Sequence, residues 1–198
     1  MTWVKLCGMR RREDVLAAVD AGADAVGFVS FEGSKRHVPL GEIGALAEGV
    51  AIERYLVTVD LPADTVVGAA LDAGLSGVQP HGEHAVAVAV AASEAGLSVL
   101  FPVAVNGSVD LSAVPERVMP ILDSGGTGVH GGSGIPFDWS LAAGVRRDVV
   151  IAGGLTPGSV AEAVALAGPW GVDVSSGVES APGEKDPSLM VRFVEALR

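Results

Sequence analysis

The sequence predicts an α/β protein with a single (β/α)8 TIM barrel over residues 1–198, and three observations lead to this prediction. Short apolar runs alternate with alanine-rich helical segments along the whole chain, which is typical of a parallel sheet with crossover helices. The alternation repeats eight times at roughly 25 residues a unit, and eight units favour closure into a barrel. Neither a proline- or serine-rich linker nor a block of charge divides the chain. A doubly wound open sheet is the alternative that this pattern leaves open.

The predicted strands are short runs of apolar and β-branched residues. Some are continuous, such as Val149-Val150-Ile151, and continuous apolar strands are typical of a sheet that is buried on both faces. In chain order the eight strands are residues 3–7, 25–29, 54–59, 77–79, 98–103, 117–122, 149–152 and 171–174.

The predicted helices have apolar residues at helical spacing, and several end at a glycine, as at Gly22, Gly74 and Gly96. Pro62 stands at the start of one helix, where its missing N–H is not needed. The helices are residues 11–21, 40–48, 62–73, 83–95, 138–143, 157–167 and 188–197, with a weak, short helix at 110–114. The longest irregular stretch, residues 123–138, holds six glycines, and a loop of that length is expected to be functional.

Composition excludes several classes of protein. Thirteen basic residues against 24 acidic ones give a formal net charge of −11, which disfavours nucleic acid or an anionic membrane as a partner. No apolar run approaches the roughly 20 residues of a membrane span, and residues 1–7 lack a secretory pattern. The single cysteine cannot form an internal disulfide, which suits a reducing compartment. We therefore expect a cytoplasmic protein, and a monomer, because no helix face stands out as an apolar patch.

Two side chains at strand ends are candidates for acid–base chemistry, because active sites in these barrels lie at the C-terminal ends of the strands. Cys7 ends the first strand beside Gly8, and it is either a buried small hydrophobic residue or a reactive one. Asp123 ends the sixth strand before the glycine-rich loop, where it either caps a turn or faces a ligand. Local sequence alone leaves both pairs of alternatives open.

Glycine-containing segments follow strands seven and eight, where these barrels frequently bind phosphate. Gly153-Gly154 follows the seventh strand, and Ser175-Ser176-Gly177 follows the eighth strand, which contains Asp173. Backbone N–H groups at such sites hold an anion without any lysine. These two segments therefore predict a phosphate site that even this acidic chain can form.

Other polar residues allow two interpretations each. Arg36, in the loop after strand two, is either a solvated surface residue or a planar fork for a carboxylate. Gln79 and His81 end the fourth strand, and His81 is either a structural histidine or a binding residue, while His130 lies in the long loop. The histidines and carboxylates show no metal-ligand spacing, and nucleotide-binding motifs and a nucleophile elbow are absent from the sequence. We therefore expect neither a metal nor a cofactor.

A series of short motifs covers the chain nearly end to end. The motifs are Val4-Lys5-Leu6-Cys7-Gly8-Met9 and residues 21–28, 77–82, 121–124, 131–134, 137–139, 151–157, 172–179 and 182–186. In this order and spacing, the chain resembles the phosphoribosylanthranilate isomerase family.

The resemblance implies the Amadori rearrangement of N-(5′-phosphoribosyl)anthranilate, a step of tryptophan biosynthesis that needs no cofactor. It implies that Cys7 is the general base and Asp123 the general acid. It places the anthranilate carboxylate on Arg36. The further substrate-binding residues that it implies are Gln79, His81, Gly153, Gly154, Asp173, Ser175, Ser176 and Gly177.

The sequence departs from the usual family pattern in the loops after strands two to four. Lys35 replaces a proline, the segment 29–33 is unusual, the third strand ends at Asp60, and Pro80 replaces a leucine. Two rival functions stay open: a paralogous isomerase of specialised anthranilate metabolism, and an inactive barrel that binds a phosphate ligand. A dual-substrate relative, which also serves histidine biosynthesis, is disfavoured because it is longer and has a carboxylate in the place of Cys7.

Catalysis by Cys7 requires a thiolate, which nearby positive charge would stabilise. The candidates for that charge are Lys5 and the basic run at residues 10–12.

Overall fold

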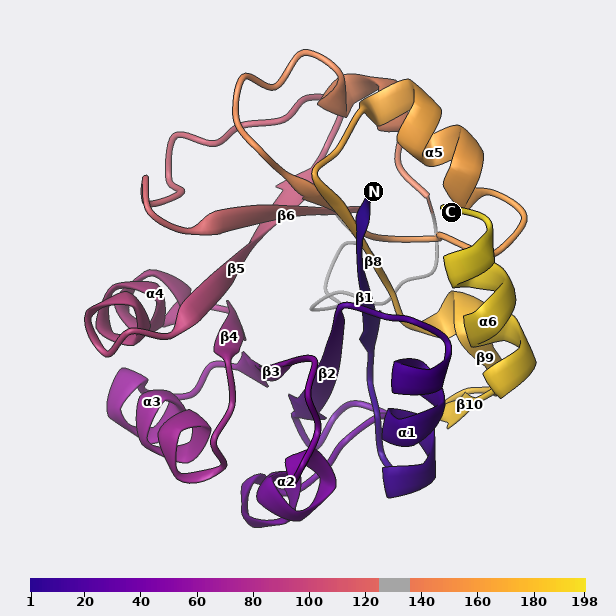
Figure 1. Cartoon of the computed structure of the whole chain (residues 1–198). Coiled ribbons are helices and arrows are strands. Elements are labelled where there is room, and N and C mark those ends of the chain that lie inside the picture. The colour runs from indigo at the N-terminus through magenta and orange to yellow at the C-terminus, as the bar shows by residue number, and fades with distance from the viewer. Residues whose placement is uncertain (125–135) are drawn as a thin grey trace.

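A computed structural model describes residues 1–124 and 136–198 and shows a closed barrel of eight parallel strands (Figure 1). The strands pair in chain order, and β8 pairs with β1 to close the barrel. Their bounds are β1 Trp3–Cys7, β2 Ala25–Ser30, β3 Glu53–Val59, β4 Gly77–His81, β5 Ser98–Val105, β6 Met119–Ser124, β7 Val150–Ile151 and β8 Gly171–Val174. The predicted barrel is confirmed, and the open-sheet alternative is wrong because the first and last strands are hydrogen-bonded.

Helices form an outer layer around the strands (Figure 1). They are α1 Arg12–Asp20, α2 Leu40–Ala47, α3 Ala63–Asp72, α4 Ala85–Glu94, α5 Val160–Ala167 and α6 Pro187–Glu195, with 3-10 turns η1 Trp139–Ala142 and η2 Ser176–Val178. A small antiparallel hairpin of β9 Glu179–Ala181 and β10 Glu184–Lys185 follows β8, and the sequence did not predict it.

Alternate residues of each strand contribute to two separate cores, as the period of two in a strand requires. Outward-facing residues such as Val4, Leu6 and Phe28 pack against the helices in the larger core. A smaller cluster inside the barrel contains Tyr55 and Ile121. Its members and the residues packed on them are Ala25, Tyr55, Leu100, Ile121, Val150 and Ala152 with Trp3 and Met119. This cluster closes the N-terminal end of the barrel and leaves the inward residues at the other end free to form a site.

The helix expected at residues 110–114 is wrong, because this stretch between β5 and β6 forms turns. The Asp110 side chain accepts a hydrogen bond from the Ser112 backbone N–H at 2.9 Å, and such local bonds compete with a helix. Val114 is buried beneath the turns and anchors the segment to the larger core. The predicted glycine-rich loop, with His130, lies at residues 125–135, outside the described residues.

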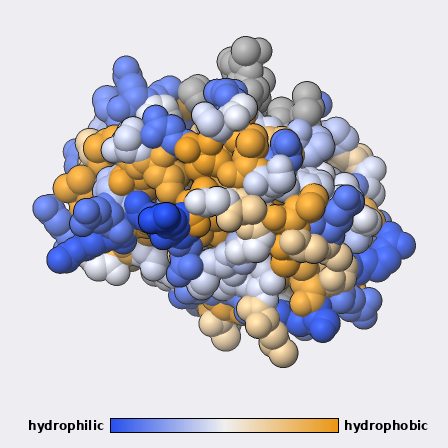
Figure 2. Space-filling model, turned by 90° about the horizontal axis from the view of Figure 1, so that it is seen from above, coloured by the Kyte–Doolittle hydropathy of each residue, from blue (hydrophilic) through white to orange (hydrophobic). Residues whose placement is uncertain are grey.

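The helical surface exposes single apolar side chains on several helices. Figure 2 shows the face at the top of Figure 1, where a band of hydrophobic residues is bordered by hydrophilic ones. The exposed large apolar residues on helices are Leu16, Leu71, Val86, Val90, Leu166 and Val191, which come from α1, α3, α4, α5 and α6. Among the described residues, no helix combines the length and hydrophobicity needed to cross a bilayer.

Candidate active site

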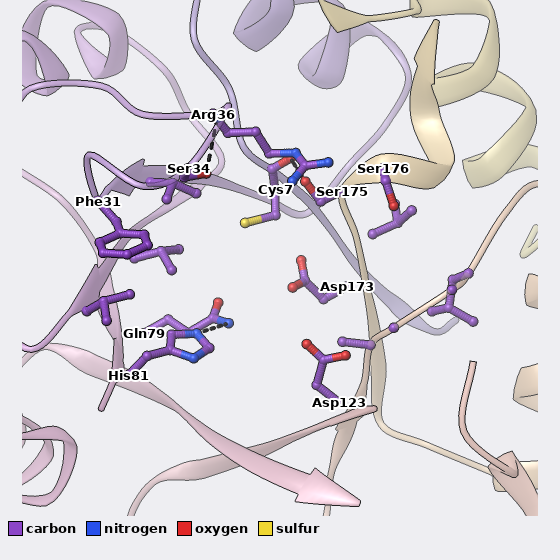
Figure 3. A pocket seen from close by; sticks show the side chains of 18 residues that line it. Cys7, Phe31, Ser34, Arg36, Gln79, His81, Asp123, Asp173, Ser175 and Ser176 are labelled. Atoms are coloured by element: carbon purple, nitrogen blue, oxygen red, sulfur yellow. Dashed lines mark hydrogen bonds between the residues drawn. The ribbon is translucent and has the colours of Figure 1, made fainter. Parts of the chain in front are cut away.

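A cavity of about 780 Å³, counted to its open mouth, lies at the C-terminal ends of the barrel strands. It brings together ten of the eleven residues that the sequence singled out, from β1, β4, β6 and β8 and from the loops after β2, β7 and β8 (Figure 3). The ten are Cys7, Arg36, Gln79, His81, Asp123, Gly153, Gly154, Asp173, Ser175 and Ser176. The eleventh, Gly177, does not line the cavity, and a side chain there would collide with the backbone oxygen of Leu155. Gly177 thus lets the two loops after β7 and β8 approach each other closely.

Cys7 is the last residue of β1, and its side chain points into the cavity (Figure 3). A neighbouring glycine makes the room for it, since a Cβ at Gly27 would stand 2.7 Å from the Cys7 sulfur and 3.2 Å from Nζ of Lys5. Burial raises the pKa of the Cys7 thiol, and the Asp173 carboxylate raises it further, whereas Lys5 and Lys185 lower it. The net direction is upward, so the two lysines offset only part of the cost of burying a thiolate.

Of the two candidate sources of positive charge near Cys7, Lys5 lies beside the thiol, whereas Arg11 of the basic run at residues 10–12 pairs with a carboxylate elsewhere. Lys5 stands two residues before Cys7 on β1 and therefore on the same inner face of the barrel. Its side chain is fully buried, and Nζ donates to Asp173 Oδ1 at 2.9 Å and to Gln79 Oε1 at 2.8 Å. Arg11 instead pairs with Asp14 at 2.7 Å, on the outer side of the barrel.

The Lys5–Asp173 pair follows from the strand register, in which these two residues are partners on β1 and β8. Burial lowers the pKa of Lys5, but the attraction of Asp173 outweighs this effect and the pKa is raised. Lys5 is therefore an ammonium ion over the working pH range. A fixed positive charge thus lies beneath the thiol of Cys7.

Asp123 lies near the end of β6, three strands around the barrel from Cys7, and its carboxylate faces the same cavity (Figure 3). Oδ1 accepts a hydrogen bond from the Ser124 backbone N–H at 2.8 Å. Gly153 permits the arrangement, because a Cβ there would lie 2.5 Å from Oδ1, and its φ of 79° also favours glycine. The glycine after β7 therefore leaves space for the carboxylate of β6.

The loops after β7 and β8 lie side by side, because these strands are neighbours in the barrel. Gly154 has a φ of 68°, and Pro136 backbone atoms crowd the space that a side chain would need. Ser175 Oγ donates to the Cys7 carbonyl oxygen at 3.1 Å, which ties the β8 loop to the end of β1. Ser176 lines the cavity and begins the 3-10 turn η2. The structure therefore brings the two glycine-containing loops together at one edge of the cavity, and the phosphate site there stays a prediction.

Arg36 also lines the cavity, but its guanidinium already holds a carboxylate of this chain. Nε donates to Glu179 Oε1 at 2.7 Å, and Nη2 donates to Glu179 Oε2 at 2.8 Å. The Arg36 side chain is 16% exposed and that of Glu179 4% exposed. Sequence reasoning gave Glu179 no role, and only its place in a family motif marked it.

Comparison with known proteins adds to this geometry. A sequence model described as N-(5'phosphoribosyl)anthranilate (PRA) isomerase matches residues 4–196, which is nearly the whole chain. The chain belongs to the phosphoribosylanthranilate isomerase family.

Relatives with this name cover the chain from end to end. The N-(5'-phosphoribosyl)anthranilate isomerase of Rubrobacter xylanophilus is 41% identical over 207 residues and covers 100% of both chains. That of Geobacter sp. strain M21 is 40% identical and covers 98% of this chain and 97% of its own.

Solved structures of the family share the fold. The phosphoribosyl anthranilate isomerase of Thermus thermophilus superimposes with a TM-score of 0.88 at 31% identity, over 99% of this chain and 98% of its own. A family structure in complex with reduced 1-(o-carboxyphenylamino)-1-deoxyribulose 5-phosphate has a TM-score of 0.83 at 32% identity, again over 99% and 98% of the chains.

The wall of the cavity built by β3, β4 and the loop after β2 carries several apolar side chains. It presents Val57 and Val59 from β3 and Phe31 from the loop after β2, none of which the sequence reasoning singled out. The missed signal is their alternation, since Val57 and Val59 are two apart at the end of a strand and so face inward. Gln79 and His81 repeat this pattern on β4, with 3.4 Å between Gln79 Nε2 and His81 Nε2.

Two of the departures from the usual family pattern, Asp60 and Pro80, lie on the strands of this wall or directly after them. Asp60 has a φ of 52°, a left-handed conformation that aspartate tolerates, and its Oδ1 accepts from the Glu83 backbone N–H at 2.8 Å. Pro80 is paired with Thr58 in the β3–β4 register. Among the described residues, no cluster of histidine, cysteine and carboxylate side chains is placed to hold a metal ion.

Proposed function

We propose that this chain isomerises N-(5′-phosphoribosyl)anthranilate to 1-(2-carboxyphenylamino)-1-deoxyribulose 5-phosphate, with Cys7 as general base and Asp123 as general acid. One observation carries the assignment of roles: Cys7 and Asp123, from β1 and β6, face one cavity that the phosphate-type loops of β7 and β8 also line. Membership of the isomerase family supports the same reaction.

In this proposal the substrate takes one orientation in the cavity. Its phosphate lies at the loops Gly153-Gly154 and Ser175-Ser176, where backbone N–H groups favour an anion. Its aromatic ring lies against the apolar side chains of Val57, Val59 and Phe31. Its carboxylate lies at the guanidinium of Arg36, and the ribose then spans the space between Cys7 and Asp123.

The reaction assigns one proton transfer to Asp123 and one to Cys7, and a tautomerisation completes it. Asp123 donates a proton to the furanose ring oxygen, the bond from that oxygen to C1′ breaks, and an iminium ion forms at C1′. Cys7 then removes the proton from C2′, whose acidity the iminium has raised, and an enolamine results. Tautomerisation to the ketone adds a proton at C1′ and removes one from the C2′ hydroxyl group. Each acid or base contributes about 10²–10⁴ to the rate.

Nearby positive charges, and not exposure of the thiol to water, favour this chemistry at Cys7. The thiol is only 6% exposed, and burial raises its pKa, so the fixed charges of Lys5 and Lys185 are needed for the thiolate to form. Asp173 lies on the opposite side of Lys5 and keeps that lysine charged.

The remaining parts of the proposal are a single domain, a monomer and a cytoplasmic location. A dimeric phosphoribosylanthranilate isomerase is known from Thermotoga maritima, so sedimentation of the purified chain tests the monomer directly.

One assay tests the function. Purified protein should remove the fluorescence of phosphoribosylanthranilate, and the Cys7→Ala variant should do so about 10²–10⁴ times more slowly. An inactive binding barrel would bind the substrate without removing its fluorescence. A paralogue of specialised metabolism would prefer a different anthranilate derivative in the same assay.

A further inference from the structure

A buried cluster of charged side chains lies directly behind the cavity, between the loop after β2 and the hairpin of β9 and β10. At its centre, Glu179 accepts hydrogen bonds from Arg36 at 2.7 and 2.8 Å and from Lys185 Nζ at 2.8 Å. The Lys185 side chain is fully buried, and that of Glu179 is 4% exposed. The backbone N–H of Gly183 donates to the same carboxylate at 3.2 Å. Glu179 is thus held from three directions.

The hydrogen bonds to Glu179 use one edge of the Arg36 guanidinium and leave its other edge for a ligand. A guanidinium has five N–H donors, arranged so that two edges can each grip a carboxylate. Glu179 occupies the edge of Nε and Nη2. The edge of Nη1 and Nη2 is left for a second carboxylate, and Arg36 lines the cavity.

The surroundings of Arg36 restrict its side chain further. A Cβ at Gly8 would stand 2.5 Å from Arg36 Cδ and 3.0 Å from Ser175 Oγ, so the arginine crosses the backbone next to Cys7. Figure 3 shows this path, with Arg36 running above Cys7 toward Ser175. The position of the guanidinium is therefore determined by Gly8 beneath it and by Glu179 beside it.

Charge in the cluster suits an anionic ligand. With Lys185 protonated, Arg36, Lys185 and Glu179 sum to one positive charge; burial lowers the pKa of Lys185, and Glu179 offsets this effect in part. Burial raises the pKa of Glu179, but the bonds from Arg36 and Lys185 outweigh that effect and lower it, so the carboxylate stays ionised. A carboxylate from a ligand would bring the cluster to neutrality.

We propose that Glu179 is a positioning residue that orients Arg36 so that the free edge of its guanidinium grips the aromatic carboxylate of the substrate. This inference rests on the proposed function, which places that carboxylate at Arg36. Lys185 joins the carboxylate subsite to the phosphate loop, because Nζ also donates to the Ser175 carbonyl oxygen at 2.9 Å.

The test compares two ligands that differ in one group. The first is reduced 1-(o-carboxyphenylamino)-1-deoxyribulose 5-phosphate, and the second is the same compound without the carboxylate. Calorimetry measures the Kd of each for the wild type, Glu179→Gln, Arg36→Ala and the double variant. Glu179→Gln should weaken the first ligand about tenfold, as loss of a charged hydrogen-bond network does, and leave the second within about twofold. In the Arg36→Ala background, adding Glu179→Gln should change neither Kd.

Two results would overturn the proposal: unchanged affinity of Glu179→Gln for the carboxylated ligand, or an equal loss for both ligands. Glu184→Gln, an exposed residue of the same hairpin, is the matched control and should bind both ligands as the wild type does. If Glu179→Gln does not fold, Arg36→Lys carries the test, because lysine keeps the charge but has no second edge. Wild-type affinity of Arg36→Lys for the carboxylated ligand would then overturn the proposal.

Failure of the proposed function would look different. Wild-type protein that does not isomerise phosphoribosylanthranilate, yet discriminates the two ligands through Glu179, would refute the catalytic role alone.

Discussion

The two walls of the cavity differ in how they hold their side chains. The charged wall is formed by β8 and β1 together with Arg36 from the loop after β2, with Cys7 and Asp173 at the surface and Lys5 buried beneath them. The neutral wall is formed by β3, β4 and Phe31, with valine and phenylalanine side chains beside Gln79 and His81. Each charge of the first wall has a partner at 2.7–2.9 Å, whereas the apolar side chains of the second are held by shape.

This difference has a consequence for what each wall can do. Replacing one member of a buried ion pair leaves the other charge uncompensated, so the charges of the first wall are fixed in place. Fixed charges of this kind suit proton transfer and the binding of an anion. The free energy of an apolar contact changes gradually with the area that is buried. The second wall therefore suits recognition of an aromatic ring.

The largest expected effect is on the acid–base pair. Cys7→Ala and Asp123→Asn should each lower kcat by about 10²–10⁴, because each removes one proton transfer. Affinity for the reduced product analogue should stay within a few fold, because neither residue is assigned to hold the phosphate or the carboxylate. Stopped-flow fluorescence with calorimetry checks both quantities. A variant with near-wild-type kcat would remove its residue from the mechanism.

The next effect concerns the charged wall as a binding surface. Arg36→Ala should raise KM about 10- to 100-fold, the value of a hydrogen-bonded ion pair, and lower kcat much less. The loss also leaves Glu179 with Lys185 as its single cationic partner among the described side chains, so the melting temperature should be measured alongside. An unchanged KM would place the carboxylate of the substrate elsewhere.

A smaller effect is expected on the pH dependence. Cys7 acts as a base only as a thiolate, so kcat/KM rises with pH through the pKa of this thiol. Lys5 lowers that pKa, so Lys5→Met should move the rising limb to higher pH. Alkylation of the thiol by iodoacetamide as a function of pH measures the same shift without turnover. An alkylation midpoint equal to that of the wild type would show that Lys5 does not support the thiolate.

The smallest effect is expected on the neutral wall. Phe31→Leu keeps an apolar side chain and removes part of the surface against the ring, so KM should rise no more than about fourfold. kcat should be unchanged. A rise in KM as large as that of Arg36→Ala would mean that the neutral wall contributes as much to substrate binding as the charged one.

Most of the barrel could be predicted from the sequence, because each strand and helix depends on local periodicity. β1 and β8 have the predicted bounds, and the other strands differ by a few residues at their ends. Cys7 and Asp123 could be placed at the rim because both end strands, a local property that the barrel rule converts into a position. The helix predicted at residues 110–114 is a turn in the structure, because a local hydrogen bond between Asp110 and Ser112 competes with helix formation.

The buried charge pairs could not be predicted, because they depend on register and on long-range contact. Lys5 and Asp173 are 168 positions apart, and Arg36 and Glu179 are 143 positions apart. Which inward residue of β8 meets Lys5 is decided when the barrel closes, and closure leaves no local signal. Glu179 in addition belongs to a two-strand hairpin that lies outside the repeating pattern of the barrel.

The central claim, that Cys7 removes the proton from C2′ of the substrate, has a direct test. Phosphoribosylanthranilate labelled with tritium at C2′ is incubated with wild-type protein and with Cys7→Ala, and the label that remains at C2′ is measured over time. The wild type should break the bond between C2′ and tritium as it forms the product, and Cys7→Ala should lose the label about 10²–10⁴ times more slowly. Loss of the label from C2′ at the wild-type rate in Cys7→Ala would contradict the account.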